Sequence, residues 1–182
     1  MKGLMLALGF LVALCTLCAQ AQPAIQPDFK PDKIVGKWYS FALASNSDWF
    51  QAKRGHMKMC TTVITPTADG NLEVESTYPK NDRCEKRTMT YIKTDTPGRY
   101  TSKGIRTGSE LDITVTYTNY DGYCIITTRI NRGQSSSVMV SLFGRTQNMQ
   151  AELFDRFREV AQAQGLNAED VLILPQTGQC IL

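Results

Sequence analysis

The chain has 182 residues, of which 42% are hydrophobic and 20% are charged, and its formal net charge is +3. This length suits one domain with a sizeable core. Because basic and acidic residues are interspersed along the chain, a polybasic tract for nucleic acid or membrane is excluded as the main theme. The only histidine, His56, offers little basis for a metal site or a Ser-His-Asp triad, so we expect no metal.

The first 21 residues are predicted to form a secretory signal peptide. Lys2 precedes an apolar run over residues 4–17, and residues 19–21 (Ala-Gln-Ala) place small side chains around a cleavage site. The run is shorter than the about 18 residues expected of a membrane span, and no later segment approaches that length. We therefore expect a secreted protein without stable membrane insertion, in which residues 22–182 form one domain.

Eight short strands are predicted between residues 35 and 144. Turn signals, such as the Asp-Gly pair at 121–122, separate segments rich in β-branched and aromatic residues. The predicted strands cover residues 35–43, 57–65, 71–78, 84–93, 98–102, 111–118, 123–130 and 137–144. Successive hairpins favour an all-β fold, an eight-stranded antiparallel up-and-down barrel, because closure removes the exposed sheet edges.

Residues 150–165 have a helical pattern. Their apolar side chains fall on one face, with charges opposite: Leu153, Phe157, Val160 and Ala161. Gly165 is placed to cap the C-terminus of the helix. The pattern predicts one C-terminal amphipathic α-helix against the barrel wall, followed by a short ninth strand at 171–174.

The interior of such a barrel decides its use. Eight strands enclose a space that side chains can fill or that one small ligand can occupy. The predicted strands are rich in Thr, Ser, Met and Tyr, and an apolar lining with scattered hydroxyls is typical of a small-molecule site. A filled barrel without a ligand is the alternative.

Three motifs resemble those of the lipocalin family. Gly36 and Trp38 match the Gly-x-Trp motif of the first strand, and residues 118–120 (Thr-Asn-Tyr) resemble its Thr-Asp-Tyr turn, with Asn in place of Asp. Arg145 resembles the arginine that follows the last barrel strand. Its guanidinium can stack over the indole of Trp38 and close the barrel floor. Together the motifs imply the lipocalin fold.

Further segments match one group of that family: residues 43–49, 59–60, 66–70, 84–89 and 174–180. They resemble the lipocalin-type prostaglandin D synthases and, within that group, the amphibian choroid-plexus lipocalins. The resemblance implies a secreted, monomeric carrier of retinoids, prostaglandins, fatty acids or related lipids. In the enzymes, prostaglandin H2 is also isomerised to prostaglandin D2 without a redox cofactor, in the presence of a thiol such as glutathione.

Removal of the signal peptide leaves four cysteines, which allow three complete pairings: Cys60, Cys84, Cys124 and Cys180. The resemblance implies that Cys84 and Cys180 form a disulfide that pins the C-terminal tail to the barrel. In the entropy model, closing so long a loop stabilises the fold by about 4 to 5 kcal/mol.

Cys60 matches the nucleophile of the synthases. Ser40, Thr62 and Ser76 match hydroxyls that line the same pocket, and Thr62 also faces the same side as Cys60 because it lies two residues further along the strand. Only the thiolate is an effective nucleophile, so the site must lower the pKa of the thiol or stabilise its charge by hydrogen bonds. The alternative is a cysteine that acts as a small buried hydrophobe.

The ligand is expected to contact five side chains: Met89, Tyr100, Cys124, Ile126 and Phe143. Two of them depart from the synthase pattern. Phe143 replaces a tyrosine and removes one hydroxyl, and Cys124 replaces a small aliphatic residue. Cys124 could pair with Cys60, act as its redox partner or fill space, and a bridge would require Cα atoms within about 7 Å across the lumen.

The first long loop carries two groups of candidate residues at the open end. Trp49 and Phe50 could form an apolar lid, with packing against the rim as the alternative. A basic mouth that attracts carboxylate ligands is the second candidate feature, with scattered solvated charges as its alternative; its residues are Lys53, Arg54, Lys58 and Arg106.

Overall fold

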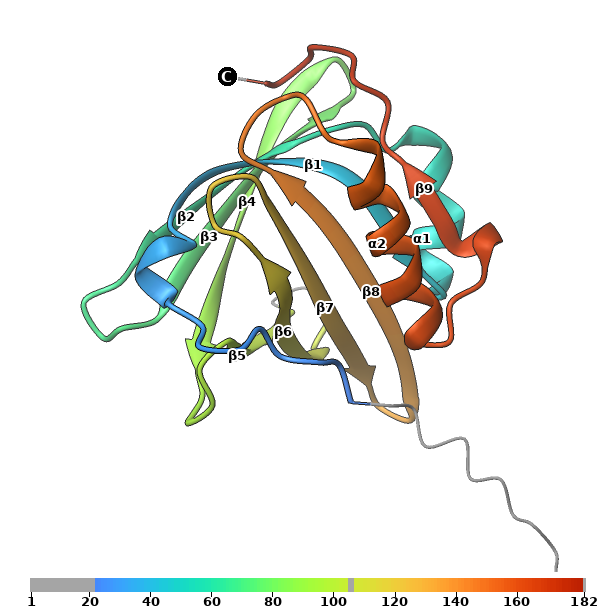
Figure 1. The fold of residues 1–182 in the computed structure, drawn as a ribbon. Coiled ribbons are helices and arrows are strands. Elements are labelled where there is room, and N and C mark those ends of the chain that lie inside the picture. The colour runs from blue at the N-terminus through green and yellow to red at the C-terminus, as the bar shows by residue number, and fades with distance from the viewer. Residues whose placement is uncertain (1–21, 105–106, 182) are drawn as a thin grey trace, which may run out of the picture.

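The computed structural model describes residues 22–104 and 107–181, so the predicted signal peptide and Arg106 lie outside the described residues. Within them, nine strands form one antiparallel sheet that closes into a barrel, because β1 pairs with both β2 and β8 (Figure 1). The strands are β1 (Gly36–Ser45), β2 (Thr61–Pro66), β3 (Leu72–Lys80), β4 (Arg83–Lys93), β5 (Arg99–Lys103), β6 (Glu110–Thr118), β7 (Tyr123–Arg132), β8 (Ser135–Gly144) and β9 (Val171–Ile173). The prediction of an eight-stranded up-and-down barrel with a short ninth strand is confirmed.

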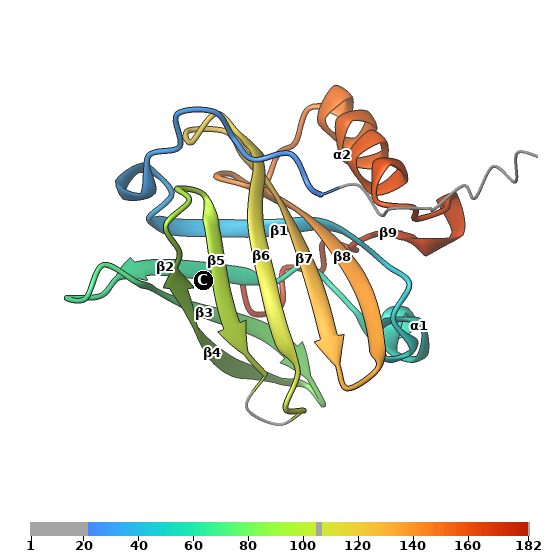
Figure 2. The ribbon, with the colours of Figure 1, turned by 90° about the horizontal axis from the view of Figure 1, so that it is seen from below.

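The strands wind around one lumen. Figure 2 shows β2, β3 and β4 on one side of the barrel and β6, β7 and β8 on the other, with β1 joining the two groups. β9 pairs antiparallel with residues 42–44 of β1. β1 itself has a bulge between Ser40 and Ala42. The bulge lets Ser40 face the lumen while Phe41 and Ala42 pack in the core outside it.

The helix α2 (Ala151–Ala163) covers the outer face of β8 and β1, as predicted. Phe157, Val160 and Ala161 are buried, and Leu153 is half-buried. Gly165 follows the C-terminus with a φ of +80°, the left-handed conformation that ends a helix most easily at glycine. Burial of this apolar face against the sheet fixes the helix on the barrel wall.

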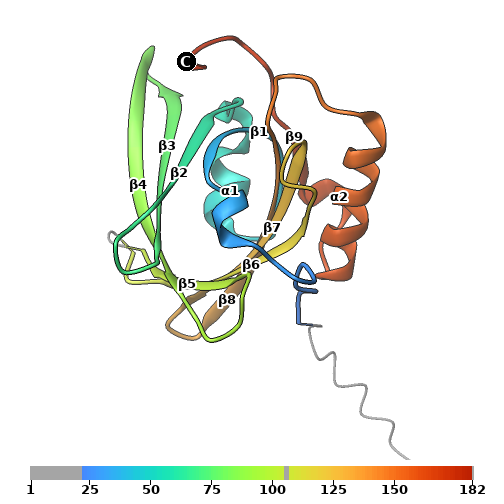
Figure 3. The ribbon, with the colours of Figure 1, turned by 60° about the vertical axis from the view of Figure 1, so that its left-hand side comes forward.

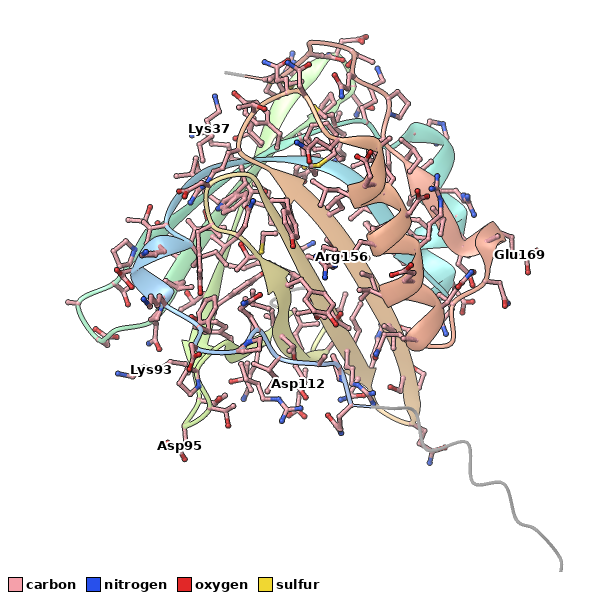
Figure 4. All side chains as sticks on the ribbon, in the orientation of Figure 1. Lys37, Lys93, Asp95, Asp112, Arg156 and Glu169 are labelled. Carbon is pink, nitrogen blue, oxygen red and sulfur yellow. A yellow bond between two sulfur atoms is a disulfide. The ribbon has the colours of Figure 1, made fainter. Side chains whose placement is uncertain are left out.

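Many charged side chains lie on the outside of the barrel. Figure 4 labels Lys37, Lys93, Asp112, Arg156 and Glu169 among them. Arg156 extends from α2 to the strands, where its guanidinium lies over the Tyr117 ring and donates to the Tyr123 hydroxyl at 3.0 Å. None of the described helices is long and apolar enough to span a membrane.

A short helix that the sequence did not predict, α1 (Asp48–Lys53), lies in the first long loop. Ser47 caps it by accepting a hydrogen bond from the Phe50 N–H at 3.3 Å. Phe50 is fully buried, so its prediction as part of a lid is wrong, whereas Trp49 is 58% exposed. Burial of Phe50 anchors the helix and leaves Trp49 on the surface.

Arg54 begins a 3₁₀ turn, η2 (Arg54–His56), and holds the loop against the C-terminal part of the chain. Its guanidinium donates to the carbonyl oxygens of Glu169 and Val171, next to the turn η3 (Ala168–Asp170) and β9. A third turn, η1 (Pro31–Lys33), precedes β1. These bonds fix the guanidinium of Arg54 where the loop meets the C-terminal part of the chain.

β2 begins later than predicted, at Thr61. The segment before it contacts the C-terminal tail instead of continuing the strand, and the Met59 N–H donates to the Pro175 carbonyl at 2.9 Å. Cys60 therefore lies just before β2, beside β1.

Candidate functional site

The C-terminal tail is covalently attached to the β3–β4 hairpin. Cys84 and Cys180 form a disulfide with a Cα–Cα distance of 5.4 Å, which confirms the predicted pair. Figure 3 shows the tail rising toward the end of this hairpin. Cys60 and Cys124 are free.

Ser40 lies against Cys60. The Ser40 hydroxyl oxygen is 3.0 Å from the Cys60 sulfur and accepts a hydrogen bond from the Cys60 N–H at 2.9 Å. The Ser40 N–H donates to the Cys60 carbonyl at 3.0 Å. These contacts fix the thiol against β1, and one hydroxyl is in place to stabilise a negative charge on sulfur.

The environment of Cys60 opposes ionisation of its thiol. Burial raises the pKa of Cys60 above its ordinary value, and the hydrogen bond with Ser40 offsets only part of this effect. At neutral pH the thiol is therefore mostly protonated, and the site does not provide the lowered pKa that the nucleophile hypothesis favours.

The other two predicted hydroxyls form a pair of their own. Thr62 on β2 faces Ser76 on β3 in the sheet register, and their hydroxyl oxygens are 3.0 Å apart. Within the described residues, Cys60 makes its side-chain hydrogen bond to Ser40 alone. The lumen thus carries two separate polar pairs rather than one cluster around the thiol.

Cys60 and Cys124 lie at opposite ends of one row of side chains. Cys60 is beside Ser40, Ser40 is opposite Phe143, and Phe143 is opposite Cys124. Three steps between strands correspond to about 14 Å along the wall, whereas a disulfide requires Cα atoms within about 7 Å. The bridge between Cys60 and Cys124 that the sequence left open is not formed.

The lumen is nearly filled at the end where the β6–β7 turn lies. A cavity of only about 10 Å³ remains there, which is room for about one water molecule. Its lining consists of Trp38, Thr62, Ile64, Tyr91, Cys124, Ile126 and Phe143. Three of the five predicted ligand contacts are therefore brought together on the floor of the barrel.

The other two predicted contacts lie elsewhere. Tyr100 is buried in the core below, with its ring 6.1 Å from that of Tyr91 and 6.4 Å from that of Phe29. Met89 is half-buried on β4 and does not line the cavity. The sequence analysis missed Tyr91, although alternation from Met89 along β4 would have placed it on the same face.

Cys124 fills space on this floor. Burial raises its pKa to about 12, and the hydrogen bond with Thr118 and the charge of Arg145 lower it by less. Burial also raises the pKa of Tyr91 to about 12. Both groups are neutral at physiological pH, so the floor presents an uncharged surface to the lumen.

Above the floor, the inner face of β8 is not fully buried. Along β8 the side chains that face the lumen, Met139, Ser141 and Phe143, keep partial exposure, whereas Val138 and Val140, which face α2, are fully buried. In a filled barrel the inner side chains would be the buried ones. The inner wall of β8 is therefore packed less completely than its outer face.

The basic mouth stays a prediction, because Arg106 lies outside the described residues. Lys58 donates to the Gln179 side chain at 3.4 Å, on the C-terminal tail, and Lys53 is exposed on α1. Among the described residues, no group of three metal-binding side chains comes together.

Comparison with known proteins places this barrel in a family. Residues 35–178 match the model of the "Lipocalin / cytosolic fatty-acid binding protein family". The chain is a lipocalin. It is 55% identical over 181 residues to a protein of Rhinella marina named "Lipocalin", and the match covers 100% of this chain and 98% of the relative.

Mammalian relatives of this lipocalin carry the name "Prostaglandin-H2 D-isomerase". The protein of Canis lupus familiaris is 41% identical over 180 residues, which cover 98% of this chain and 93% of the relative. A solved structure titled "The Siderocalin Ex-FABP functions through dual ligand specificities" aligns with a TM-score of 0.69 at 30% identity, over 80% of this chain and 95% of that chain. Members of the lipocalin family bind small hydrophobic ligands.

The lipocalin motifs seal one end of the barrel. The Arg145 guanidinium lies 3.7 Å from the centre of the Trp38 ring and donates to the carbonyl oxygens of Tyr120, Lys37 and Lys33. Gly36 has a φ of +104°, and a Cβ there would lie 3.2 Å from Arg145 Nη1. The Gly-x-Trp motif is thus explained by the close approach of the arginine.

Proposed function

We propose that this lipocalin is a secreted, monomeric carrier that binds a retinoid, a fatty acid or a related lipid in its lumen. The observation that carries the proposal is the partial exposure of the inner wall of β8 above a floor of apolar side chains. Burying about 300 Å² of apolar ligand surface supplies about 7.5 kcal/mol before entropic costs. Binding at micromolar concentrations therefore requires no chemistry. The disulfide between Cys84 and Cys180 supports secretion, because disulfides persist in oxidising compartments.

Fluorescence of Trp38 tests the carrier proposal. Trp38 lines the floor and Trp49 lies on the surface, so Trp49→Phe leaves a single reporter inside the barrel. Titration of this variant with retinol or retinoic acid should quench the fluorescence of Trp38 saturably, at one ligand per chain. A long-chain fatty acid should displace the bound retinoid and restore the fluorescence. The absence of saturable binding for all three ligands would contradict the proposal.

A second candidate function is isomerisation of prostaglandin H2 to prostaglandin D2. The names of the mammalian relatives and the contact between Ser40 and the Cys60 sulfur favour it. The Cys60 thiolate would attack one endoperoxide oxygen and break the O–O bond, and the other oxygen would take a proton. Loss of the adjacent C–H proton would then form the ketone and return the electrons of the S–O bond to sulfur, without a redox cofactor.

Activity measurements distinguish the two functions. Prostaglandin D2 formation in the presence of glutathione should be lost in Cys60→Ala and kept in Cys124→Ala, whose thiol is buried on the floor. Because burial raises the pKa of Cys60, the rate should increase as the pH rises above neutrality and thiolate accumulates. Equal product formation by wild type and Cys60→Ala would exclude the nucleophile and leave the carrier function standing.

A further inference from the structure

One cation of the segment 84–89, Arg87, faces the lumen. Arg87 lies on β4, two residues from Met89 and four from Tyr91. Tyr91 lines the cavity on the floor, and alternate residues of a strand share one face of the sheet. Arg87 therefore belongs to the inner wall, between the floor and the open end.

The sheet register gives the same result independently. Arg87 is directly opposite Ser76 on β3, and the Ser76 hydroxyl is bonded to Thr62, which lines the cavity. The adjacent residue, Lys86, faces outward and forms an ion pair with Glu75 at 2.8 Å. The charge of Arg87 also acts on the inner wall, because it lowers the pKa of Tyr91 against the larger effect of burial.

Toward the floor, the neighbours of Arg87 on this wall are apolar or carry a hydroxyl: Val74, Ser76 and Met89. Glu85, the next inner-facing residue toward the open end, forms an ion pair with Lys80 at 2.9 Å. None of the ion pairs in the described part of the chain includes Arg87. Its planar guanidinium keeps donors that fit both oxygens of a carboxylate.

We propose that Arg87 binds the carboxylate of an acidic lipid whose apolar chain extends toward the floor at Phe143 and Tyr91. The rise of a strand places Arg87 about 13 Å from Tyr91 along β4, and Met89 and Val74 line that path. The inference rests on the proposed carrier function and narrows its ligand class from hydrophobic molecules in general to lipids with a free carboxylate.

The test compares one fluorescent lipid with and without its charge: cis-parinaric acid and its methyl ester. The wild type should bind the acid about tenfold more tightly than the ester, because a hydrogen bond to a charged group is worth roughly one decade in affinity or more. Arg87→Gln should lose this preference by weakening the acid alone. Arg87→Lys should retain part of it, since the charge remains.

Lys86→Gln is the matched control, because it removes the same charge from the outer face of the neighbouring position. It should leave both affinities within about twofold of wild type. Equal weakening of acid and ester by Arg87→Gln, or equal effects of the two glutamine variants, would contradict carboxylate binding by Arg87 and leave the carrier function intact. A wild type that binds neither probe would contradict the role of Arg87, whereas the carrier function would be contradicted only if retinol and retinoic acid also failed to bind. If Arg87→Gln fails to fold, a wild type that binds acid and ester equally would still contradict carboxylate binding by Arg87.

Discussion

The two free thiols differ because of the side chains around them. Cys60 keeps partial exposure and one hydroxyl partner, Ser40, whereas Cys124 is buried on the floor of the barrel. Burial raises the pKa of both thiols. Only Cys60 can therefore meet a reagent from the lumen, and it does so mainly as the protonated thiol at neutral pH.

The pH dependence of alkylation tests this description. The rate of Cys60 modification by iodoacetamide should reach half its maximum at a higher pH than that of a free cysteine, because only the thiolate reacts and burial raises its pKa. Ser40→Ala should shift the profile to still higher pH, since it removes the bond that stabilises the thiolate. Mass spectrometry of the Cys60 peptide measures both rates.

Thr62→Ala is the control for this experiment, because Thr62 bonds to Ser76 and not to the thiol. Its profile should match that of wild type, and Cys124 should stay unmodified in the native protein. A Ser40→Ala profile at or below the wild-type pH would contradict the role of the hydroxyl.

The sequence predicted which side chains face the lumen but not which of them touch. Alternation correctly placed Thr62 on the inner face. Its partner is Ser76, because a residue directly opposite on the next strand is closer than one two positions along the same strand. Contact with Cys60 depended on β1, where the bulge after Ser40 is not visible in the pattern of residues.

At the scale of secondary-structure elements, the start of β1 is set by one glycine. Gly36 combines a φ of +104° with close approach of Arg145 Nη1. Gly133, in the β7–β8 turn, also has a positive φ, of +58°, but a Cβ there would meet no atom within 4 Å. The two glycines therefore differ both in backbone conformation and in crowding.

Gly36→Ala should lower the free energy of unfolding by about 2 to 3 kcal/mol, because alanine is strained at this φ and its Cβ displaces the arginine from Trp38. Gly133→Ala should lower the free energy of unfolding by less than about 1 kcal/mol, since its left-handed conformation is tolerated where no atom is close. Urea denaturation measures both changes. Losses of equal size would contradict both the additional backbone strain and the crowding at Gly36.

The long strands and α2 could be predicted from alternation, turn residues and one apolar helical face. The short helix α1 could not, because it rests on burial of a single side chain, Phe50, that reads equally well as a surface lid. The late start of β2 has a similar cause. Hydrogen bonding of Met59 to the tail at Pro175 joins segments far apart in the sequence.

At the scale of the whole molecule, one disulfide links two distant parts of the chain. Cys84 and Cys180 are separated by 96 residues, so the bond restricts a large part of the unfolded chain. Tail contacts at Met59 and Thr61 add hydrogen bonds on either side of Cys60. The covalent link therefore stabilises the barrel as a unit.

Removal of this disulfide should lower stability substantially. The double variant Cys84→Ser/Cys180→Ser should lose up to about 4 to 5 kcal/mol of unfolding free energy, and reductant should have no further effect on it. Cys60→Ala is the control and should respond to reductant like wild type, because Cys60 is free. Urea denaturation with and without reductant gives the comparison, and an unchanged midpoint in the double variant would contradict the expectation.

The stack of Arg145 on Trp38 also determines how a ligand would exchange. Since this end of the barrel is sealed and its floor leaves room for about one water molecule, we expect a ligand to enter and leave at the opposite end. A lipid must leave through the end of the barrel by which it entered, so the part of the lipid that entered last leaves first. Residence time is then controlled at the open end, so substitutions in the loop that carries Trp49 should change the rates of binding and release together while the affinity stays the same.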